Sequence, residues 1–264
     1  MDAASGKSTS NELIDLCAKT VEKAKEEGVI LRAIGAVAIR LHTRELEDLH
    51  KRLGRKAASG EEISDLDYIT YTKMRSKVEK VLEKFGYTPD HAAQMLAWLW
   101  SERPVYIVPQ GKYHADIFFD KLEMCHTVDF KNRLEKDFPT IPLAELMMEK
   151  MQIVQINEKD LKDCTALLIG HDVGSEDCEV VNGQHIAKVL ANDWGFWYTM
   201  TTNLQKLKNY SVKLNLTPEE RGIVESRLAK LLQLIEQEPK TSAWQKRAKT
   251  GTSKKWYRDV EEIG

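Results

Sequence analysis

The stretch Ile63-Ser64-Asp65-Leu66-Asp67-Tyr68-Ile69-Thr70-Tyr71 decides the fold of this 264-residue chain. Beyond Ser64, apolar or aromatic side chains alternate with the two aspartates, and a period of two predicts a β-strand. Asp65 and Asp67 would then project from the same face of that strand.

Two carboxylates so close together repel each other. They are tolerated when water solvates them at the surface, or when a divalent cation lies between them. Mg²⁺ prefers a few carboxylates together with phosphate oxygens. The pair therefore leaves two interpretations open, a solvated strand face and a metal site.

A glycine turn lies upstream of the pair. Residues 29–34 are short and partly β-branched, Gly35 follows, and residues 36–41 are apolar, which predicts strand, turn and helix. One continuous helix over 29–42 is the alternative. In the first case, Gly35 lets backbone N–H groups at the helix N-terminus approach a phosphate. A further amphipathic helix is expected over 11–27.

A third acid, Asp116, lies on a strand expected over 113–119, where it is embedded beside bulky apolar residues. On a strand adjacent to the first pair, it would complete a site of three carboxylates.

The remaining patterns divide the chain into two domains. Another strand is expected over 103–108, and helices over 44–57, 73–85, 91–100, 143–156, 158–169, 182–209 with a break near Gly195, and 217–237. The last of these helices opens on Thr217, Pro218 and Glu220, a capping pattern. We expect an α+β domain over 1–138, with a small mixed sheet flanked by helices, followed by an all-helical domain over 139–264.

The order of a glycine turn before a helix, a strand with two aspartates and a single acid on a later strand resembles the nucleotidyltransferase superfamily, whose fold is similar to the palm of DNA polymerase beta. Residues 142–152 and 158–163 also resemble a stretch of AbiEii-type nucleotidyltransferase-like proteins, which include abortive-infection toxins. The resemblance covers roughly residues 29–168.

This resemblance implies transfer of a nucleoside monophosphate from a nucleoside triphosphate to a hydroxyl of a protein, an RNA or a small molecule. It implies Mg²⁺ or Mn²⁺ held by Asp65, Asp67 and Asp116, with Asp116 as general base, and triphosphate contacts from Gly35 and Ala36. Ala36 lacks the hydroxyl that the family often has at this turn. A toxin would have an antitoxin partner, and an antibiotic-modifying enzyme is another member type. The alternative is a non-catalytic nucleotide- or partner-binding protein that retains the fold.

Lys150 lies on the apolar stripe of its predicted helix, four residues after Leu146. A buried ammonium is costly unless it reaches a cleft or a partner acid. It is interpreted as a triphosphate ligand, with snorkelling at the edge of the stripe as the alternative. Asp160 is explained by helix capping after Asn157.

Composition excludes several classes of protein. The chain has 39 Lys and Arg against 41 Asp and Glu, a net charge of -2, so no basic field covers the whole protein. The four cysteines are scattered and form no CxxC pair, which predicts reduced thiols that pack as small apolar groups. No apolar run approaches the roughly 18 residues that span a bilayer, and residues 1–12 are polar. We expect a cytoplasmic protein without membrane contact.

Two aromatic segments in the second half leave alternatives open. Residues 240–258 hold seven Lys or Arg interleaved with Trp244, Trp256 and Tyr257, a pattern typical of RNA binding but also of a segment whose aromatic rings dock on the body. Residues 193–198 form either a core anchor or a stacking wall.

The histidines of this sequence form no motif that predicts a metal site or a phosphohydrolase. The pair His171-Asp172 has no second pair at a suitable spacing, so it does not predict a phosphohydrolase. Cys125, His126, Cys164, His171 and Cys178 lack the spacing of a zinc motif.

Overall fold

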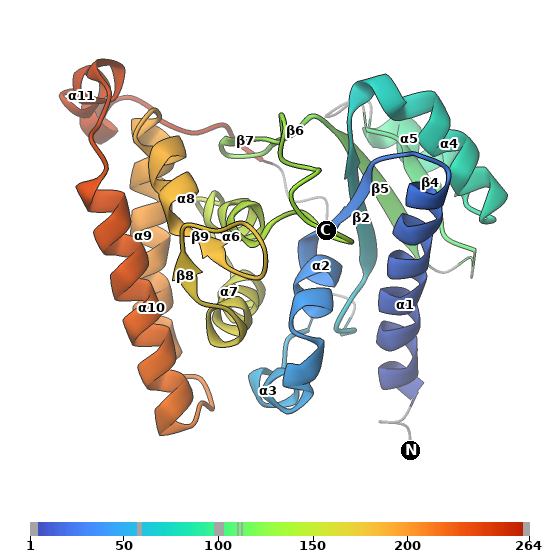
Figure 1. Ribbon diagram of the computed structural model, residues 1–264, viewed down its shortest axis with the longest axis horizontal. Helices are drawn as coiled ribbons and strands as arrows, with labels where there is room; N and C mark the ends of the chain where they lie inside the picture. Colours follow the sequence, from blue (N-terminus) through green and yellow to red (C-terminus); the bar gives the residue numbers. More distant parts are fainter. Residues whose placement is uncertain (1–4, 57–59, 98–102, 110, 112, 261–264) are drawn as a thin grey trace. The chain divides into compact units, whose positions relative to one another are not determined.

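The computed structural model describes residues 5–56, 60–97, 103–109, 111 and 113–260. The chain has a mixed α+β fold and divides into two compact units (Figure 1). Unit 1 takes up the chain to Leu41, Lys56–Leu122 and Asp129–Ile141, and unit 2 takes up His42–Arg55, Glu123–Val128 and the chain from Pro142 onward. This division differs from a single boundary near residue 138, because two segments of the first half pack with the second half.

Unit 1 holds the strands β1 to β5 of a mixed sheet, in the order β1-β2-β5-β4-β3; β6 pairs with β5, and β7 pairs with β6. The strands are β1 (Leu31–Ile34), β2 (Asp65–Thr70), β3 (Thr88–Pro89), β4 (Val105–Ile107), β5 (His114–Phe119), β6 (Lys121–Glu123) and β7 (Thr127–Asp129). β2 is antiparallel to β1 and parallel to β5. The strands predicted around residues 29–34, 65–71, 103–108 and 113–119 are therefore confirmed.

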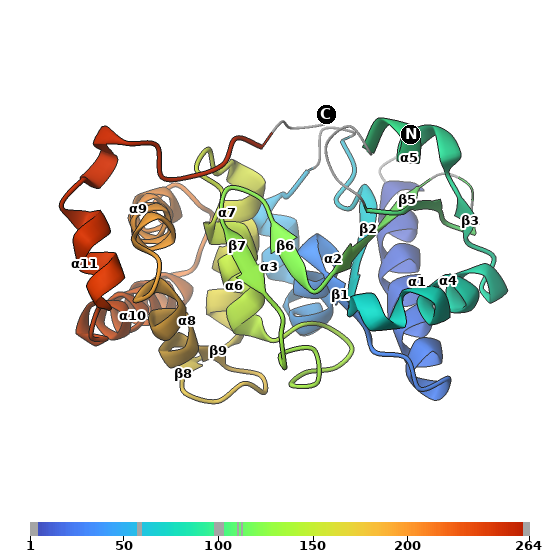
Figure 2. The same cartoon turned by 90° about the horizontal axis from the view of Figure 1, so that it is seen from above.

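The helices of unit 1 are α1 (Ser5–Glu26), α4 (Arg75–Lys84) and α5 (His91–Ala97), and α2 (Gly35–His42) begins there. α1 packs against β1 and α4, and Figure 2 shows α1 and α4 side by side. Because β1 ends and α2 begins at Gly35, the continuous helix over 29–42 is excluded. Residues 98–100 of the predicted 91–100 helix, and positions 110 and 112 of the turn that follows, lie outside the described residues.

Unit 2 is mainly helical, with α3 (Glu47–Leu53), α6 (Leu143–Met151), α7 (Glu158–Gly170), α8 (Gly183–Leu190), α9 (Trp194–Ser211), α10 (Pro218–Gln237) and α11 (Ser242–Ala248). α6 is buried on nearly all sides and packs against α7, α8 and α9. α9 and α10 run side by side (Figure 1). The capping box at Thr217 and Glu220 is confirmed, since each side chain bonds to the backbone of the other.

The prediction of an all-helical second domain is wrong in one respect. β8 (Val173–Gly174) and β9 (Val181–Asn182) form a parallel two-stranded sheet in unit 2. Two-residue strands are too short to produce an alternating pattern in the sequence, and their pairing depends on the loop that brings them together. The predicted helix over 182–209 also divides earlier than expected, between α8 and the Asp193 cap of α9.

Candidate metal and nucleotide site

The three aspartates predicted from the sequence come together on one face of the sheet. β2 and β5 are parallel neighbours, and their register places Asp67 directly opposite Asp116. Paired residues on adjacent strands point the same way, with backbones about 4.8 Å apart. Asp65 lies two residues before Asp67, on the same face and about 6.6 Å along the strand.

The opposite face of β2 is buried, and this burial fixes the direction in which the aspartates point. Leu66 and Tyr68 have no exposed surface. The Tyr68 hydroxyl lies 2.9 Å from the hydroxyl of Tyr87, which lies 3.0 Å from the Thr20 hydroxyl of α1. On the aspartate face, Asp65 is exposed and Asp67 and Asp116 are half-buried.

Burial and neighbouring charges shift the pKa of Asp116. Burial raises the pKa of its carboxyl; the guanidinium of Arg103, 3.3 Å away, opposes this rise, and the charge of Asp65 adds to it. Ser64 Oγ donates a hydrogen bond of 2.7 Å to Asp65 Oδ2. Three carboxylates on one face are the hard oxygen donors that Mg²⁺ and Mn²⁺ prefer, and a bound divalent cation would favour their ionised form.

The raised pKa of Asp116 predicts a pH-dependent gain in stability on its removal. Folding raises this pKa, so the folded chain keeps the proton over a pH range in which the unfolded chain has lost it. The carboxylate therefore lowers the free energy of unfolding as pH rises above the ordinary aspartate range. Asp116→Asn should unfold at a higher temperature than the native chain at pH 7 without metal, and at nearly the same temperature near pH 3. Thermal unfolding at both pH values tests this, and an equal shift at both would contradict it.

Gly35 brings backbone close to the aspartates. Its φ is +70°, and a Cβ atom at this position would lie 2.8 Å from Asp67 Oδ2. The register of β1 explains the approach, since Ile34 pairs with Asp67. Gly35 is also the first residue of α2, whose N-terminal N–H groups carry partial positive charge. Ala36, in the first turn, is half-buried.

Gly28 provides a matched control for a substitution at Gly35. It has the same φ of +70°, but no atom lies within 4 Å of the Cβ position. We expect Gly28→Ala to cost about 1–2 kcal/mol, the usual price of the left-handed backbone. Gly35→Ala should cost more, because the methyl group also displaces the Asp67 carboxylate. Chemical denaturation of both variants measures the difference, and equal losses would show that the contact with Asp67 has no energetic effect.

The oxygens of the three aspartates do not all lie within 4.8 Å of one another. Mutual repulsion separates carboxylates, and Ser64 and Arg103 hold two of them in place. Two-metal sites place their ions about 3.5–4 Å apart and distribute the carboxylates between them. Three carboxylates on one face could be shared between two ions in this way.

Lys150 lies in unit 2, in a buried ion-pair network. Its ammonium is 3.1 Å from Asp160 Oδ1 and 3.3 Å from Asp163 Oδ2, and Arg55 binds Asp163 at 2.7 Å. Burial alone would lower the pKa of Lys150, but the two carboxylates outweigh it and raise the pKa. The partner acid is thus the reason that this stripe tolerates a lysine, while triphosphate binding by Lys150 stays a prediction. The cap at Asn157 is confirmed, because its side chain accepts from the Asp160 N–H.

The aromatic groups of 240–258 pack within unit 2. The Trp256 indole donates to Thr199 Oγ1 at 3.1 Å, and the Trp244 ring meets Trp197 edge-on at 5.1 Å. Arg258 donates to the carbonyl of Met124. The docking alternative therefore accounts for these rings. Trp194 and Phe196 of the 193–198 segment are also buried, as core anchors are.

Sequence reasoning missed one group of potential ligands, formed by His42, His171 and Glu179. The sequence offers His171 only with Asp172 or with Cys125, His126, Cys164 and Cys178, and neither grouping includes His42 or Glu179. His42 and His171 are 129 positions apart, and no local pattern connects residues at that separation.

We compared the chain with protein-family models, curated proteins and solved structures, and none of the three comparisons found a match. Within the part of the chain that the structure describes, no helix is both long and apolar enough to cross a lipid bilayer. Function is therefore inferred from the arrangement of the side chains.

Proposed function

We propose that this protein transfers a nucleoside monophosphate from a nucleoside triphosphate to a hydroxyl acceptor, with Mg²⁺ or Mn²⁺. The common face of Asp65, Asp67 and Asp116 is the observation that supports this most strongly. The positive φ of Gly35 beside Asp67 adds a backbone approach for phosphate at the same place.

The residues of the site divide between two tasks in this proposal, metal binding and phosphate binding. Asp65, Asp67 and Asp116 would hold the ions, and the N–H groups of Gly35 and Ala36 would bind phosphate oxygens at the start of α2. A bound divalent ion supplies charge stabilisation at the phosphates and acidifies a nearby hydroxyl. The missing side chain at Gly35 leaves room for the phosphate next to Asp67.

Transfer of the nucleoside monophosphate requires one group that accepts the proton of the acceptor hydroxyl. The acceptor oxygen forms a bond to the α-phosphorus, the bond from that phosphorus to the bridging oxygen breaks, and pyrophosphate leaves. The hydroxyl proton passes to the carboxylate of Asp116.

A non-catalytic nucleotide-binding protein is the second candidate. One observation favours it: Ala36 has no hydroxyl for phosphate. In this case Mg²⁺ and nucleotide would bind without turnover.

The proposal includes two macromolecular partners, an acceptor RNA and an antitoxin. An acceptor RNA would contact the exposed lysines of the 240–258 segment, which include Lys246, Lys249 and Lys254. A toxin of this type would act in the cytoplasm and be held inactive by an antitoxin.

Calorimetric titration with ATP, CTP, GTP and UTP in the presence of Mg²⁺ tests the proposal. We expect at least one nucleotide to bind the folded protein, and the double variant Asp65→Asn/Asp67→Asn to lose that binding. Glu83→Gln, an exposed carboxylate change on α4, is the matched control and should bind as the native chain does. Absence of binding, or equal binding by the double variant, would sink both candidates.

A further inference from the structure

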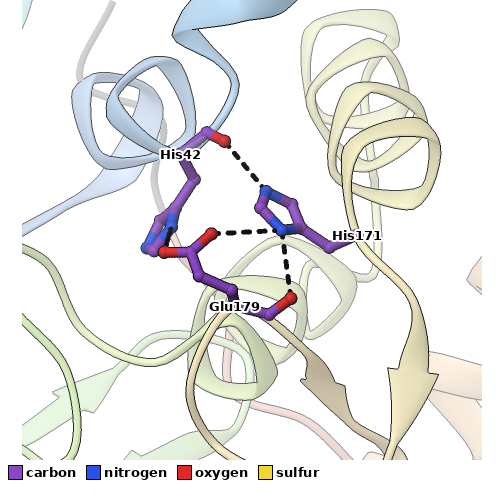
Figure 3. Close-up of side chains that lie close together, drawn as sticks. All are labelled: His42, His171 and Glu179. Carbon is purple, nitrogen blue, oxygen red and sulfur yellow. Dashed lines mark hydrogen bonds and ion pairs between the residues drawn. The ribbon is translucent and has the colours of Figure 1, made fainter.

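Two buried histidines face one exposed carboxylate in unit 2 (Figure 3). His42 Nδ1 lies 3.2 Å from Glu179 Oε1, and His171 Nδ1 lies 3.3 Å from Glu179 Oε2. His42 is the last residue of α2, His171 follows α7, and Glu179 lies in the loop before β9. Three separate segments of the chain therefore meet at this group.

The hydrogen bond that His171 Nε2 donates leaves a lone pair on His171 Nδ1, which faces two oxygens of Glu179. Its Nε2 lies 2.9 Å from the backbone carbonyl oxygen of His42, which only accepts, so Nε2 carries the proton. In a neutral imidazole, Nδ1 then has a lone pair. That nitrogen lies 3.2 Å from the Glu179 carbonyl oxygen and 3.3 Å from its carboxylate. Lone pairs facing each other repel, and either a proton on Nδ1 or a metal ion between the nitrogen and the oxygens relieves this repulsion.

The positions of the ligand atoms suit a metal ion in that place. In a tetrahedral zinc site with bonds of about 2.0–2.1 Å, neighbouring ligand atoms are about 3.3 Å apart. His42 Nδ1 lies 3.2 Å from Oε1 and His171 Nδ1 lies 3.3 Å from Oε2, so each nitrogen is about this edge length from its own oxygen of the Glu179 carboxylate. Of the residues that the structure describes, this is the group whose three ligand atoms all lie within 4.8 Å.

The surroundings also resemble an organised ligand shell. A metal-bound histidine usually donates its other N–H to a carbonyl or carboxylate, as His171 does to the His42 carbonyl. Glu179 has a φ of +52°, a left-handed conformation that costs a non-glycine residue about 1–2 kcal/mol. With this backbone, both its carbonyl and its carboxylate lie next to His171.

We propose that His42, His171 and Glu179 bind one Zn²⁺ ion. Two imidazole nitrogens and a carboxylate form a donor set that suits zinc, and the 59% exposure of Glu179 leaves a coordination position for water. The ion fastens the loop before β9 to the end of α2. This site is separate from the three aspartates and does not depend on the proposed nucleotide chemistry.

Zinc titration of the full chain, after removal of metal with a chelator, tests the site. We expect one Zn²⁺ to bind per chain at this group, and Co²⁺ to give the visible spectrum of a site with histidine ligands. Glu179→Gln should weaken Zn²⁺ binding at least tenfold, since even the loss of a supporting residue costs about 10–100-fold. Its side chain is exposed, so this variant should fold.

His185→Gln is the matched control, because His185 also pairs with a carboxylate, Glu145 at 2.9 Å, but lacks a second histidine. It should bind Zn²⁺ as the native chain does. His171→Ala should lose binding, with circular dichroism to confirm that it folds. No Zn²⁺ binding, or equal affinity in Glu179→Gln, would overturn the proposal. If Asp65→Asn/Asp67→Asn loses Zn²⁺ binding and Glu179→Gln keeps it, the ion binds at the aspartates, and this result would also overturn the proposal.

Discussion

Asparagine in place of Asp67 is expected to lower nucleotidyl transfer at least about a thousandfold. A metal ion supplies several kcal/mol of charge stabilisation in the transition state, and about 1.4 kcal/mol corresponds to a factor of ten in rate. Asp67 is the central acid of the site, since it pairs with Asp116 in register and lies against Gly35. Asparagine keeps the shape of the side chain and removes only the charge.

The rate is measured with nucleoside triphosphates that carry a label in the α-phosphate. Two quantities are followed: the label that is incorporated into RNA, protein or a small-molecule hydroxyl, and the pyrophosphate that is released. Glu83→Gln should match the native chain. An Asp67→Asn variant that keeps activity within tenfold of the native rate would contradict the assigned role. Native protein that binds the nucleotide with Mg²⁺ but never transfers label would instead favour the non-catalytic candidate.

The second large effect concerns stability. Lys150→Met should lower the free energy of unfolding by about 3–5 kcal/mol, because removing one partner of a buried ion pair leaves an uncompensated charge. Arg55 still pairs with Asp163 in this variant, so the carboxylate left without its partner is that of Asp160. Asp163 Oδ2, which lies 3.3 Å from Nζ without hydrogen-bond geometry, also loses a favourable charge.

Urea denaturation of two further variants separates this network from a general effect of losing a lysine. Lys162→Met, on the same helix as Asp160 and Asp163, loses only an exposed bond to the Gly54 carbonyl and should cost less than about 1 kcal/mol. Lys150→Met/Asp160→Asn should recover part of the stability, since the unpaired charge is gone. A loss of less than 1 kcal/mol in Lys150→Met would contradict the structural role.

Local patterns in the sequence identify the strand of the candidate site. The alternation around Asp65 and Asp67 depends on which side of β2 is buried, and Leu66 and Tyr68 carry that signal in the sequence itself. Gly35 marks the end of β1 because its positive φ suits glycine. The capping box at Thr217 likewise depends on residues three positions apart.

Long-range contacts explain what the sequence did not show. Lys150 looked anomalous on its helix, but its partners Asp160 and Asp163 come from the next helix, and only the packing of α6 on α7 brings them together. His42 and Glu179 belong to no motif with His171. The pairing of the short strands β8 and β9 depends on the loop between them, which also holds Glu179. Such contacts are set by tertiary packing, which hydrophobic periodicity does not encode.

The central claim is that Asp65, Asp67 and Asp116 together hold divalent cations at a nucleotide. A crystal structure of the protein with Mn²⁺ and a non-hydrolysable nucleoside triphosphate, with the manganese located by anomalous scattering, tests it most directly. We predict anomalous peaks between these three carboxylates, with the triphosphate beside Gly35. Manganese absent from the three aspartates, with the nucleotide bound elsewhere or not at all, would contradict the claim.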